Sequence, residues 1–583
     1  MPSGTAGTPR RILLSGVFGP FGVDDAWGRK ENIMELFHNQ VTKAQGAASF
    51  RFHHRSFGLY FLAENVDADV TVLDFPNRER FVSELREGYD LVGISFIAPN
   101  FAKARDMARL VRLLSPGSRI VLGGHGAAIE GIENLIDCDD VVRGEGIRGL
   151  RTILGQDPGA PIVHPVLPSA ERESILGIPL LGRSANLLVP GVGCVNGCRF
   201  CSTSHFFGKA YRPFLGTGRE LFETARQIAD RTGTDDFFVM DENFLKDTGR
   251  AHELLEEMER HRRFFGFQVF SSAEAIRAFG LDNMVRLGVS FVWIGFESAT
   301  RTGNYAKNEG IDARRLTREL RDRGITVLAS SILCAEHHTP ENIGAEIDFM
   351  VGLEADMVQF MLLTPLPVTA LYREMKQEGL LREDLPWEEW HGQKELSWKH
   401  PAFPGDAPAR WLGKAFRADH EANSSTMYRV IETAFRGWKR LAALPRRDAC
   451  IEHRMARLAK RTLDWMPPLA VLSRNGVNRL ERERAVRLEQ EISDALGVSA
   501  LRRLAYGATV RALAAAWRLR LRLFGDGIQP ATILTRYPAH GRRALGVPIA
   551  PAGLSAAASE PSSLQIAARE ALEVAVRVAG ASA

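Results

Sequence analysis

Short apolar runs alternate with amphipathic segments along the first part of the chain. The segment at 101–114 carries apolar residues at helical spacing and predicts a helix. Because buried strands separated by helices form parallel sheets, this alternation predicts a doubly wound, Rossmann-like α/β domain. An aromatic insertion at 32–66, ending in a predicted helix, interrupts it. The predicted strands are 12–15, 70–75, 91–95, 120–123 and 141–143.

The middle of the chain repeats a strand-then-helix pattern. Six strands with helices between them predict a partial (βα)6 barrel, whose functional side chains lie at the carboxyl ends of the strands. For the last helix, Thr339 is the predicted N-cap and Pro340 the first helical residue. The predicted strands are 185–189, 236–240, 267–270, 291–295, 326–333 and 357–362, and the helices are 218–231, 250–262, 313–323 and 340–353.

Beyond residue 400 the alternation of strands and helices stops, and a mainly α-helical region is predicted. Helices are predicted at 427–444, 452–465, 479–496 and 501–523, then a low-complexity stretch at 550–563 and a last helical piece at 565–578. The resulting domains are 1–156 (Rossmann-like), 157–184 (a Pro-containing connector), 185–400 (the barrel) and 401–583 (a basic helical region).

Composition and charge narrow the class of protein. A chain of 583 residues with 45% hydrophobic and 25% charged residues predicts roughly three globular domains. The apolar run after the N-terminus is too short for a signal peptide, and no run reaches the length of a membrane span. Six cysteines, three of them in one loop, do not form a disulfide framework, so we expect a cytoplasmic protein.

The charge is unevenly distributed. Residues 401–583 hold 29 Lys and Arg against 16 Asp and Glu, a net +13, whereas the first 400 residues carry a net −9. This asymmetry predicts an anionic partner for the C-terminal region. Peripheral contact with an anionic membrane and an acidic protein partner both fit, and nucleic acid is disfavoured. Alternatively, the helices form a cap over the mouth of the barrel with solvated arginines.

One short loop concentrates the metal-binding residues. Cys194, Cys198 and Cys201 have the spacing CxxxCxxC, with glycines before and between them. Thiolates are the ligands that zinc and iron–sulfur clusters select. His205 could complete a zinc site, because zinc usually has four ligands. Without a fourth ligand, a [4Fe–4S] cluster would keep one iron open to a small molecule.

This loop, with Phe200 before the last cysteine, resembles that of the radical S-adenosylmethionine enzymes. The resemblance implies that the open iron chelates the amino and carboxylate groups of S-adenosylmethionine. One electron from the cluster then breaks a C–S bond and gives a 5′-deoxyadenosyl radical. An electron donor such as flavodoxin or ferredoxin is also implied.

Other strand ends resemble that family in turn. By this resemblance Asp241, Glu242 and Asn243, after the second strand, bind the amino group of S-adenosylmethionine, and Glu297 and Ser298, after the fourth, face its polar end. An acidic turn exposed to solvent is the alternative for the first group. The chain departs from the family at two positions, where Cys334 and Val368 replace glycine.

The glycine loops of the first domain resemble those of a cobalamin-binding domain. The resemblance assigns cofactor binding to Ser95, Gly123, Gly124, Gly144 and Glu145. The usual Asp-x-His-x-x-Gly loop is replaced by residues 16–22, so cobalamin is expected base-off, without a histidine ligand from that loop. Tight turns in a domain that has lost its ligand would also explain the glycines. We interpret His125 as a loop residue.

Together, these resemblances predict a cobalamin-dependent radical methylase. It would methylate an unactivated carbon of a small-molecule, possibly lipid-like, substrate. Cyclisation, ring contraction or carbon–carbon coupling without methyl transfer is the alternative enzymatic function, and a zinc- or cobalamin-binding sensor is the non-enzymatic one. The sequence identifies neither a catalytic acid nor a catalytic base.

Overall fold

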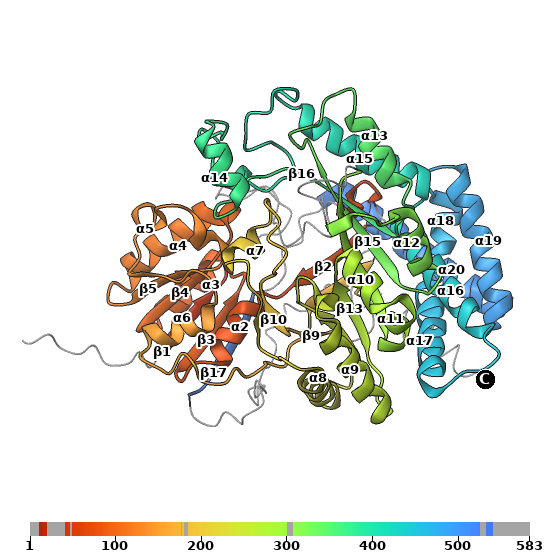
Figure 1. Ribbon diagram of the computed structural model, residues 1–583, viewed down its shortest axis with the longest axis horizontal. Coiled ribbons are helices and arrows are strands. Elements are labelled where there is room, and N and C mark those ends of the chain that lie inside the picture. The colour runs from red at the N-terminus through yellow and green to blue at the C-terminus, as the bar shows by residue number, and fades with distance from the viewer. Residues whose placement is uncertain are drawn as a thin grey trace, which may run out of the picture.

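The computed structural model consists of an α/β domain, a barrel and a layer of C-terminal helices, arranged side by side (Figure 1). The α/β domain and the helical layer lie on opposite sides of the barrel (Figure 1). The structure describes residues 11–19, 41–46, 49–175, 178–179, 185–299, 307–524 and 532–539. Residues 20–22 of the first loop, and the segments at 550–563 and 565–578, lie outside this range.

The N-terminal domain is a doubly wound sheet, which confirms the predicted fold class. Its order is β17-β3-β1-β4-β5-β6, and every pairing among β1 and β3–β6 is parallel. Nearly all residues of the central strands are buried, as expected of a sheet covered on both faces. The elements are β1 (Arg11–Ser15), α2 (Phe57–Glu64), β3 (Asp69–Asp74), α3 (Arg78–Leu85), β4 (Leu91–Ser95), α4 (Phe101–Leu114), β5 (Arg119–Gly123), β6 (Asp140–Val141) and α6 (Gly146–Ile153).

The far edge of this sheet comes from the other end of the chain. Strand β17 (Ile533–Tyr537) pairs antiparallel with β3, and Tyr537 is buried there. Arg536 contacts both carboxylate oxygens of Glu84 at 3.2 Å. The region after residue 400 is mainly helical, as predicted, but β17 itself was not predicted, because a single five-residue strand lacks the repeated alternation that reveals a sheet.

The second sheet forms the partial barrel. Its strands lie in sequence order and all pair in parallel, which confirms the six predicted strands. Thr217 begins α8 with a capping box that includes Glu220. The elements are β9 (Asn186–Leu188), α8 (Gly218–Thr232), β12 (Asp236–Val239), α9 (Thr248–Arg260), β13 (Gly266–Phe270), α10 (Ala273–Phe279), α11 (Leu281–Leu287), β14 (Val289–Glu297), α12 (Ala313–Arg321), β15 (Thr326–Leu333), α13 (Ile343–Val351), β16 (Met357–Leu362) and α14 (Ala370–Gln377).

The predicted start of α13 was wrong. The helix begins at Ile343, because Asn342 folds back and accepts a hydrogen bond from the Thr339 backbone N–H at 2.8 Å. Pro340 therefore lies in a turn before the helix.

The aromatic insertion and the connector form a third, small sheet. Strand β2 (Phe50–His54) pairs antiparallel with β7 (Ala170–Ile175), which in turn pairs with β8 (Ile178–Pro179). The connector thus contains two short strands that its irregular sequence pattern did not predict.

The C-terminal helices cover the amino end of the barrel. Arg454 in α17 donates hydrogen bonds to the carbonyl oxygens of Val289 and Gly324, beside the starts of β14 and β15. The predicted alternative of a cap over the barrel mouth was therefore wrong for these helices. The elements are α15 (Ala407–Asn423), α16 (Thr426–Ala442), α17 (Ala449–Trp465), α18 (Leu469–Asn475), α19 (Arg479–Leu496) and α20 (Ala500–Phe524).

None of the helices within the described ranges combines the length and the apolar character that crossing a membrane requires.

Candidate cofactor site

The cysteine loop leaves the carboxyl end of β9, where barrel chemistry is expected. Two short strands, β10 (Gly191–Val192) and β11 (Arg212–Pro213), pair at its base. The helix α7 (Ser202–Phe206) follows the last cysteine. The Ser204 hydroxyl donates to the Cys194 carbonyl at 2.7 Å and accepts from the Gly197 N–H at 3.0 Å, so it fixes the loop from inside.

Glycine is required where this loop turns. Gly193 has φ +91°, and a Cβ there would lie 2.2 Å from the Ala210 carbonyl oxygen. Both the backbone conformation and this close approach exclude a side chain. The glycine before the first cysteine therefore lets the loop fold back over its own base.

The three thiols lie in a poorly solvated environment. Burial raises the pKa of Cys194 and Cys198, and it raises the pKa of Cys201 to about 12. A bound metal reverses this effect, since it deprotonates a coordinating thiol outright. The donor set is therefore suited to a metal centre shielded from water.

The donor set suits two kinds of metal centre. Three thiolates with His205 would complete a zinc site, and three thiolates alone would leave one iron of a [4Fe–4S] cluster open. His205 is buried in α7, and burial lowers its pKa. The residues present thus fit a [4Fe–4S] cluster bound by three cysteines.

At the end of β12, two of the three predicted residues have structural partners. Asp241 accepts hydrogen bonds from Arg250 and from the Tyr211 hydroxyl, each at 2.8 Å, and the Asp241–Arg250 pair is almost fully buried. The Asn243 side chain joins this strand end to the next one, because it bonds to Ser272 through both its oxygen and its nitrogen. Both side chains hold the strand ends together.

Glu242 is oriented differently and interacts electrostatically with the cysteine loop. Its side chain remains in contact with solvent, although protein atoms surround much of it. The loss of hydration, followed by the charge of Asp241, raises the pKa of Glu242 to about 7. The Glu242 carboxylate in turn helps to raise the pKa of Cys194 and Cys201. Of the three residues, Glu242 is the one whose carboxylate can meet a cationic ligand beside the cluster.

At the end of β14, the side chains of Glu297 and Ser298 also have different partners. Glu297 accepts a hydrogen bond from Lys307 Nζ at 2.7 Å. Burial opposes the charge on Lys307, but Glu297 and Cys198 outweigh it and raise the lysine pKa. The Ser298 hydroxyl instead donates to Glu346 at 2.9 Å, within the protein interior. Glu297 therefore faces the site and Ser298 supports its strand.

A cavity of about 250 Å³ lies beside the cysteine loop at the carboxyl ends of β14–β16. It brings Phe200 and Glu297 together, as the resemblance implied, and adds residues from beyond the barrel. Its lining is Phe200, Glu297, Ser330, Ser331, Ile332, Gln359, Met361, Leu362, Leu363, Thr364, Leu366, Trp390 and His391.

The loops of the N-terminal sheet form an open edge. A Cβ on Gly123 would meet nothing within 4 Å, so this edge has space for a ligand. Gly124 has φ +80°, and a Cβ there would lie 2.5 Å from the Phe96 carbonyl oxygen, so glycine is required. Ser95 ends β4 beside it, since its hydroxyl would lie 2.9 Å from the same Cβ. These three residues fit a bound corrinoid.

In the loop after β6, Gly144 and Glu145 have different structural settings. Gly144 has φ +86°. Glu145, however, caps α6 by accepting hydrogen bonds from the Ile147 and Arg148 N–H groups. That carboxylate is engaged by the helix, which accounts for its position without a cofactor.

The two sheets meet at α7. The His125 ring stacks on Phe206 with centroids 4.4 Å apart, and burial lowers its pKa to about 4. A Cβ on Gly144 would lie 3.8 Å from the Phe206 carbonyl oxygen. His125 thus joins the glycine loops to the helix that follows the cysteines, and the carboxyl ends of both sheets face a shared region (Figure 1).

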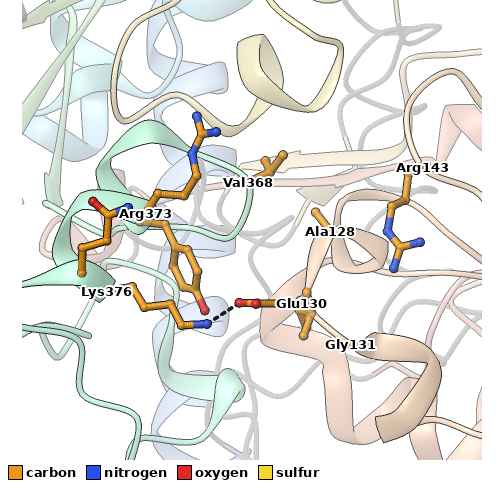
Figure 2. A pocket seen from close by; sticks show the side chains of 10 residues that line it. Ala128, Glu130, Gly131, Arg143, Val368, Arg373 and Lys376 are labelled. Atoms are coloured by element: carbon orange, nitrogen blue, oxygen red, sulfur yellow. Dashed lines mark hydrogen bonds and ion pairs between the residues drawn. The ribbon is translucent and has the colours of Figure 1, made fainter. Parts of the chain in front are cut away.

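A second cavity, of about 480 Å³, opens between the two domains. Figure 2 shows Ala128, Glu130 and Arg143 on one side and Arg373 and Lys376 on the other. An ion pair between Lys376 and Glu130 crosses it. α14 reaches this position because the Leu371 N–H bonds to the Arg199 carbonyl of the cysteine loop at 3.1 Å. The barrel and the glycine-loop domain thus enclose this cavity together.

Sequence reasoning missed the residues that act across strands. No sequence motif marks Lys307, Arg250 or Tyr211, because their roles depend on partners that lie elsewhere in the chain. Trp390 and His391 come from the segment after the barrel, whose path the strand pattern does not reveal.

Two family models match the chain. The model described as B12 binding domain matches residues 46–154, and the model described as Radical SAM superfamily matches residues 188–350. The first covers the glycine loops after β4, β5 and β6, and the second covers the cysteine loop and the strand ends through β15.

The chain is also similar to named methyltransferases. An uncharacterized methyltransferase of Pyrococcus horikoshii is 23% identical, over 56% of this chain and 79% of its own length. Bacteriochlorophyllide d C-8(2)-methyltransferase of Chlorobaculum tepidum is 25% identical, over 52% of this chain and 72% of its own length. Among solved structures, the radical S-adenosylmethionine methyltransferase TsrM of Kitasatospora setae matches with a TM-score of 0.49 and 16% identity, over 78% of this chain and 99% of that one.

Proposed function

We propose that this chain, a radical S-adenosylmethionine enzyme with a B12-binding domain, methylates an unactivated carbon of a small-molecule substrate. The observation that carries the proposal is the meeting of the two sheets at α7. It brings the glycine loops of one domain beside the cysteine loop of the other. Two cofactors held at these edges could act on one substrate between them.

When bound, the cluster and S-adenosylmethionine supply a 5′-deoxyadenosyl radical, and the corrinoid supplies the methyl group. Cys194, Cys198 and Cys201 would hold three irons of the cluster. Glu242 would place its carboxylate beside the ammonium group of S-adenosylmethionine. Phe200 and Glu297 line the adjoining cavity and help to exclude water.

The substrate enters, in this proposal, through the cavity between the domains. A lipid-like substrate is consistent with the enzyme lying at an anionic membrane through its basic C-terminal region. A reduced flavodoxin or ferredoxin would supply the electron. A cytoplasmic location suits this chemistry, because thiols and clusters stay reduced there.

Product analysis after anaerobic reconstitution with iron, sulfide and cobalamin tests the function. Methylation predicts that S-adenosylhomocysteine and 5′-deoxyadenosine form together, and that Cys198→Ala abolishes the deoxyadenosine. Deoxyadenosine alone would favour the cyclisation, ring-contraction or coupling alternative. Neither product, from protein with a full complement of iron and cobalamin, would contradict the proposal.

A further inference from the structure

The last described helix, α20, has an apolar face that none of the described residues covers. Leu501, Leu504, Leu519 and Leu523 are 79%, 66%, 58% and 64% exposed. Exposed leucines at a single position are common, but this set recurs at helical spacing over the whole helix. Between these leucines the same face continues through exposed alanines at 505, 508, 512, 515 and 516.

The opposite face attaches the helix to the protein. Ala514 and Trp517 are buried, and Ala514 belongs to the core formed with α18 and α19. At Gly507 the helix passes close to Ala470 of α18, since a Cβ there would lie 3.2 Å from the alanine Cβ. The outward stripe is therefore fixed in orientation by packing on its other side.

Arginines flank the stripe on both sides. α20 contains six arginines and no acidic residue. Within the described ranges none of the six forms an ion pair, unlike the arginines of α16 and α17 that reach carboxylates. At 100° per residue, Arg502 and Arg520 lie along one border of the stripe, and Arg511, Arg518 and Arg522 lie along the other.

We infer that α20 lies flat on an anionic lipid surface, with its leucine and alanine stripe inserted and its arginines at the headgroups. The inference assigns the membrane contact of the proposed function to one helix. It rests on that function only for the purpose that the membrane location would serve. Binding of a helix in the plane of an interface strengthens with the apolar area that it buries and with the attraction of its basic side chains to anionic lipids. Arginine side chains can bury their methylene stems while keeping the charge among phosphates.

Charge decides against a second copy of the chain as the occupant. Two α20 helices packed stripe to stripe would bring their ten bordering arginines together, whereas anionic headgroups neutralise them. Figure 1 places α20 on the side of the barrel away from the glycine-loop domain, so membrane contact would leave the cavity between the domains open.

Flotation of the full chain with vesicles tests this inference. One set of vesicles is pure phosphatidylcholine, and the other contains roughly a third phosphatidylglycerol. We expect binding to the anionic vesicles at about 0.05 M salt and much less at about 0.5 M, because salt screens the arginines. Binding to neither set, or equal binding to both, would overturn the inference.

Two variants assign binding to this face. Replacing Arg518, Arg520 and Arg522 by Gln should weaken binding about fivefold per arginine. Leu519→Gln with Leu523→Gln should weaken it about tenfold or more. Circular dichroism and melting temperature check that both variants fold, and their deoxyadenosine formation in solution should equal that of the wild type. If deoxyadenosine formation fails in all the proteins alike, the proposed function fails, while vesicle binding remains a separate result.

A matched control lies in α4 of the first domain. Leu113 is 74% exposed, and Arg109 is an exposed arginine one turn away. Arg109→Gln with Leu113→Gln should leave vesicle binding unchanged. An equal loss in this control would overturn the assignment to α20. So would leucine variants of α20 that still bind vesicles but no longer self-associate, because the stripe would then be an interface between copies.

Discussion

Asp241 and Glu242 are neighbours in sequence, yet their carboxylates have different partners. Asp241→Asn would leave the buried Arg250 guanidinium without its counter-ion, so we expect a loss of about 3 kcal/mol in the free energy of unfolding. Glu242→Gln removes a carboxylate that faces the cluster loop. It should leave stability unchanged and weaken S-adenosylmethionine binding about tenfold.

Urea unfolding and anaerobic calorimetry of reconstituted protein measure these two quantities. The predicted roles would be wrong if Asp241→Asn kept full stability or if Glu242→Gln bound the cofactor normally.

Val368 adopts a backbone conformation suited to glycine, with φ +74°. A β-branched residue is strained in this conformation, whereas glycine adopts it freely. The conformation therefore explains why the resemblance leads one to expect glycine at this position. Val368→Gly and Val368→Ala both remove the branched side chain, but only glycine relieves the strain. We therefore expect the glycine variant to be about 1 kcal/mol more stable than the alanine variant, the reverse of their usual order.

Thermal and urea unfolding of the two variants decide the order. An alanine variant at least as stable as the glycine variant would show that the left-handed conformation costs little here.

The sequence revealed the cofactor residues unequally. The three thiols could be placed in one loop from their spacing alone, because neighbours in sequence must lie close together. The different roles of Asp241 and Glu242 could not be predicted, because they depend on Arg250 and Tyr211, which reach the strand end from other elements. Cys334, with φ +51°, likewise occupies a turn whose strain is invisible in its side-chain type.

At the scale of elements, the connector carries a pH-sensitive contact. His164 accepts a hydrogen bond from the Val189 N–H at 2.9 Å through Nε2, just after β9. Burial lowers its pKa from 6.5 to about 4, because the charged imidazolium would lose its hydration there. The folded state therefore resists protonation, and the stability that His164 provides is present above pH 6.5 and is lost as pH falls toward 4.

Chemical unfolding at pH 7.5 and pH 5.5 measures this contribution. We expect the wild type to lose about 1 kcal/mol more than His164→Gln, whose side-chain oxygen can accept the same bond without titrating. His125 titrates in both proteins and does not affect the difference. Equal losses would show that the pKa of His164 is the same in the folded and the unfolded protein.

Strand β17 stabilises the edge of the first sheet from the opposite end of the chain. Tyr537 is 3% exposed, so Tyr537→Ala should cost about 3 kcal/mol locally. Hydrogen exchange should then speed up in β3, whose edge β17 covers. Unchanged protection of β3 would mean that the strand contributes little to the sheet.

The repeated elements were predictable and the isolated ones were not. Strand–helix alternation repeats across both sheets, so each element supports the assignment of the next. β17 stands alone after a long helix, and β7 forms only because β2 lies beside it. Such pairings depend on the tertiary fold, which local periodicity does not encode.

At the scale of the molecule, the two α/β units present their carboxyl ends to each other, and the C-terminal helices cover the far end of the barrel. Much of the basic excess of the C-terminal region belongs to that cover, where arginines bond to strand ends. The six arginines of α20, by contrast, bond to no strand end and form no ion pair within the described ranges. Charge totals alone could not separate these two uses.

The proposed function depends on three cysteines that hold a cluster with one iron open to S-adenosylmethionine. Electron paramagnetic resonance of the reconstituted, dithionite-reduced protein tests this binding mode, recorded with and without S-adenosylmethionine. We expect a reduced-cluster signal that changes when S-adenosylmethionine is added and is lost in Cys198→Ala. One tightly bound zinc per chain, with no signal that responds to S-adenosylmethionine, would contradict it.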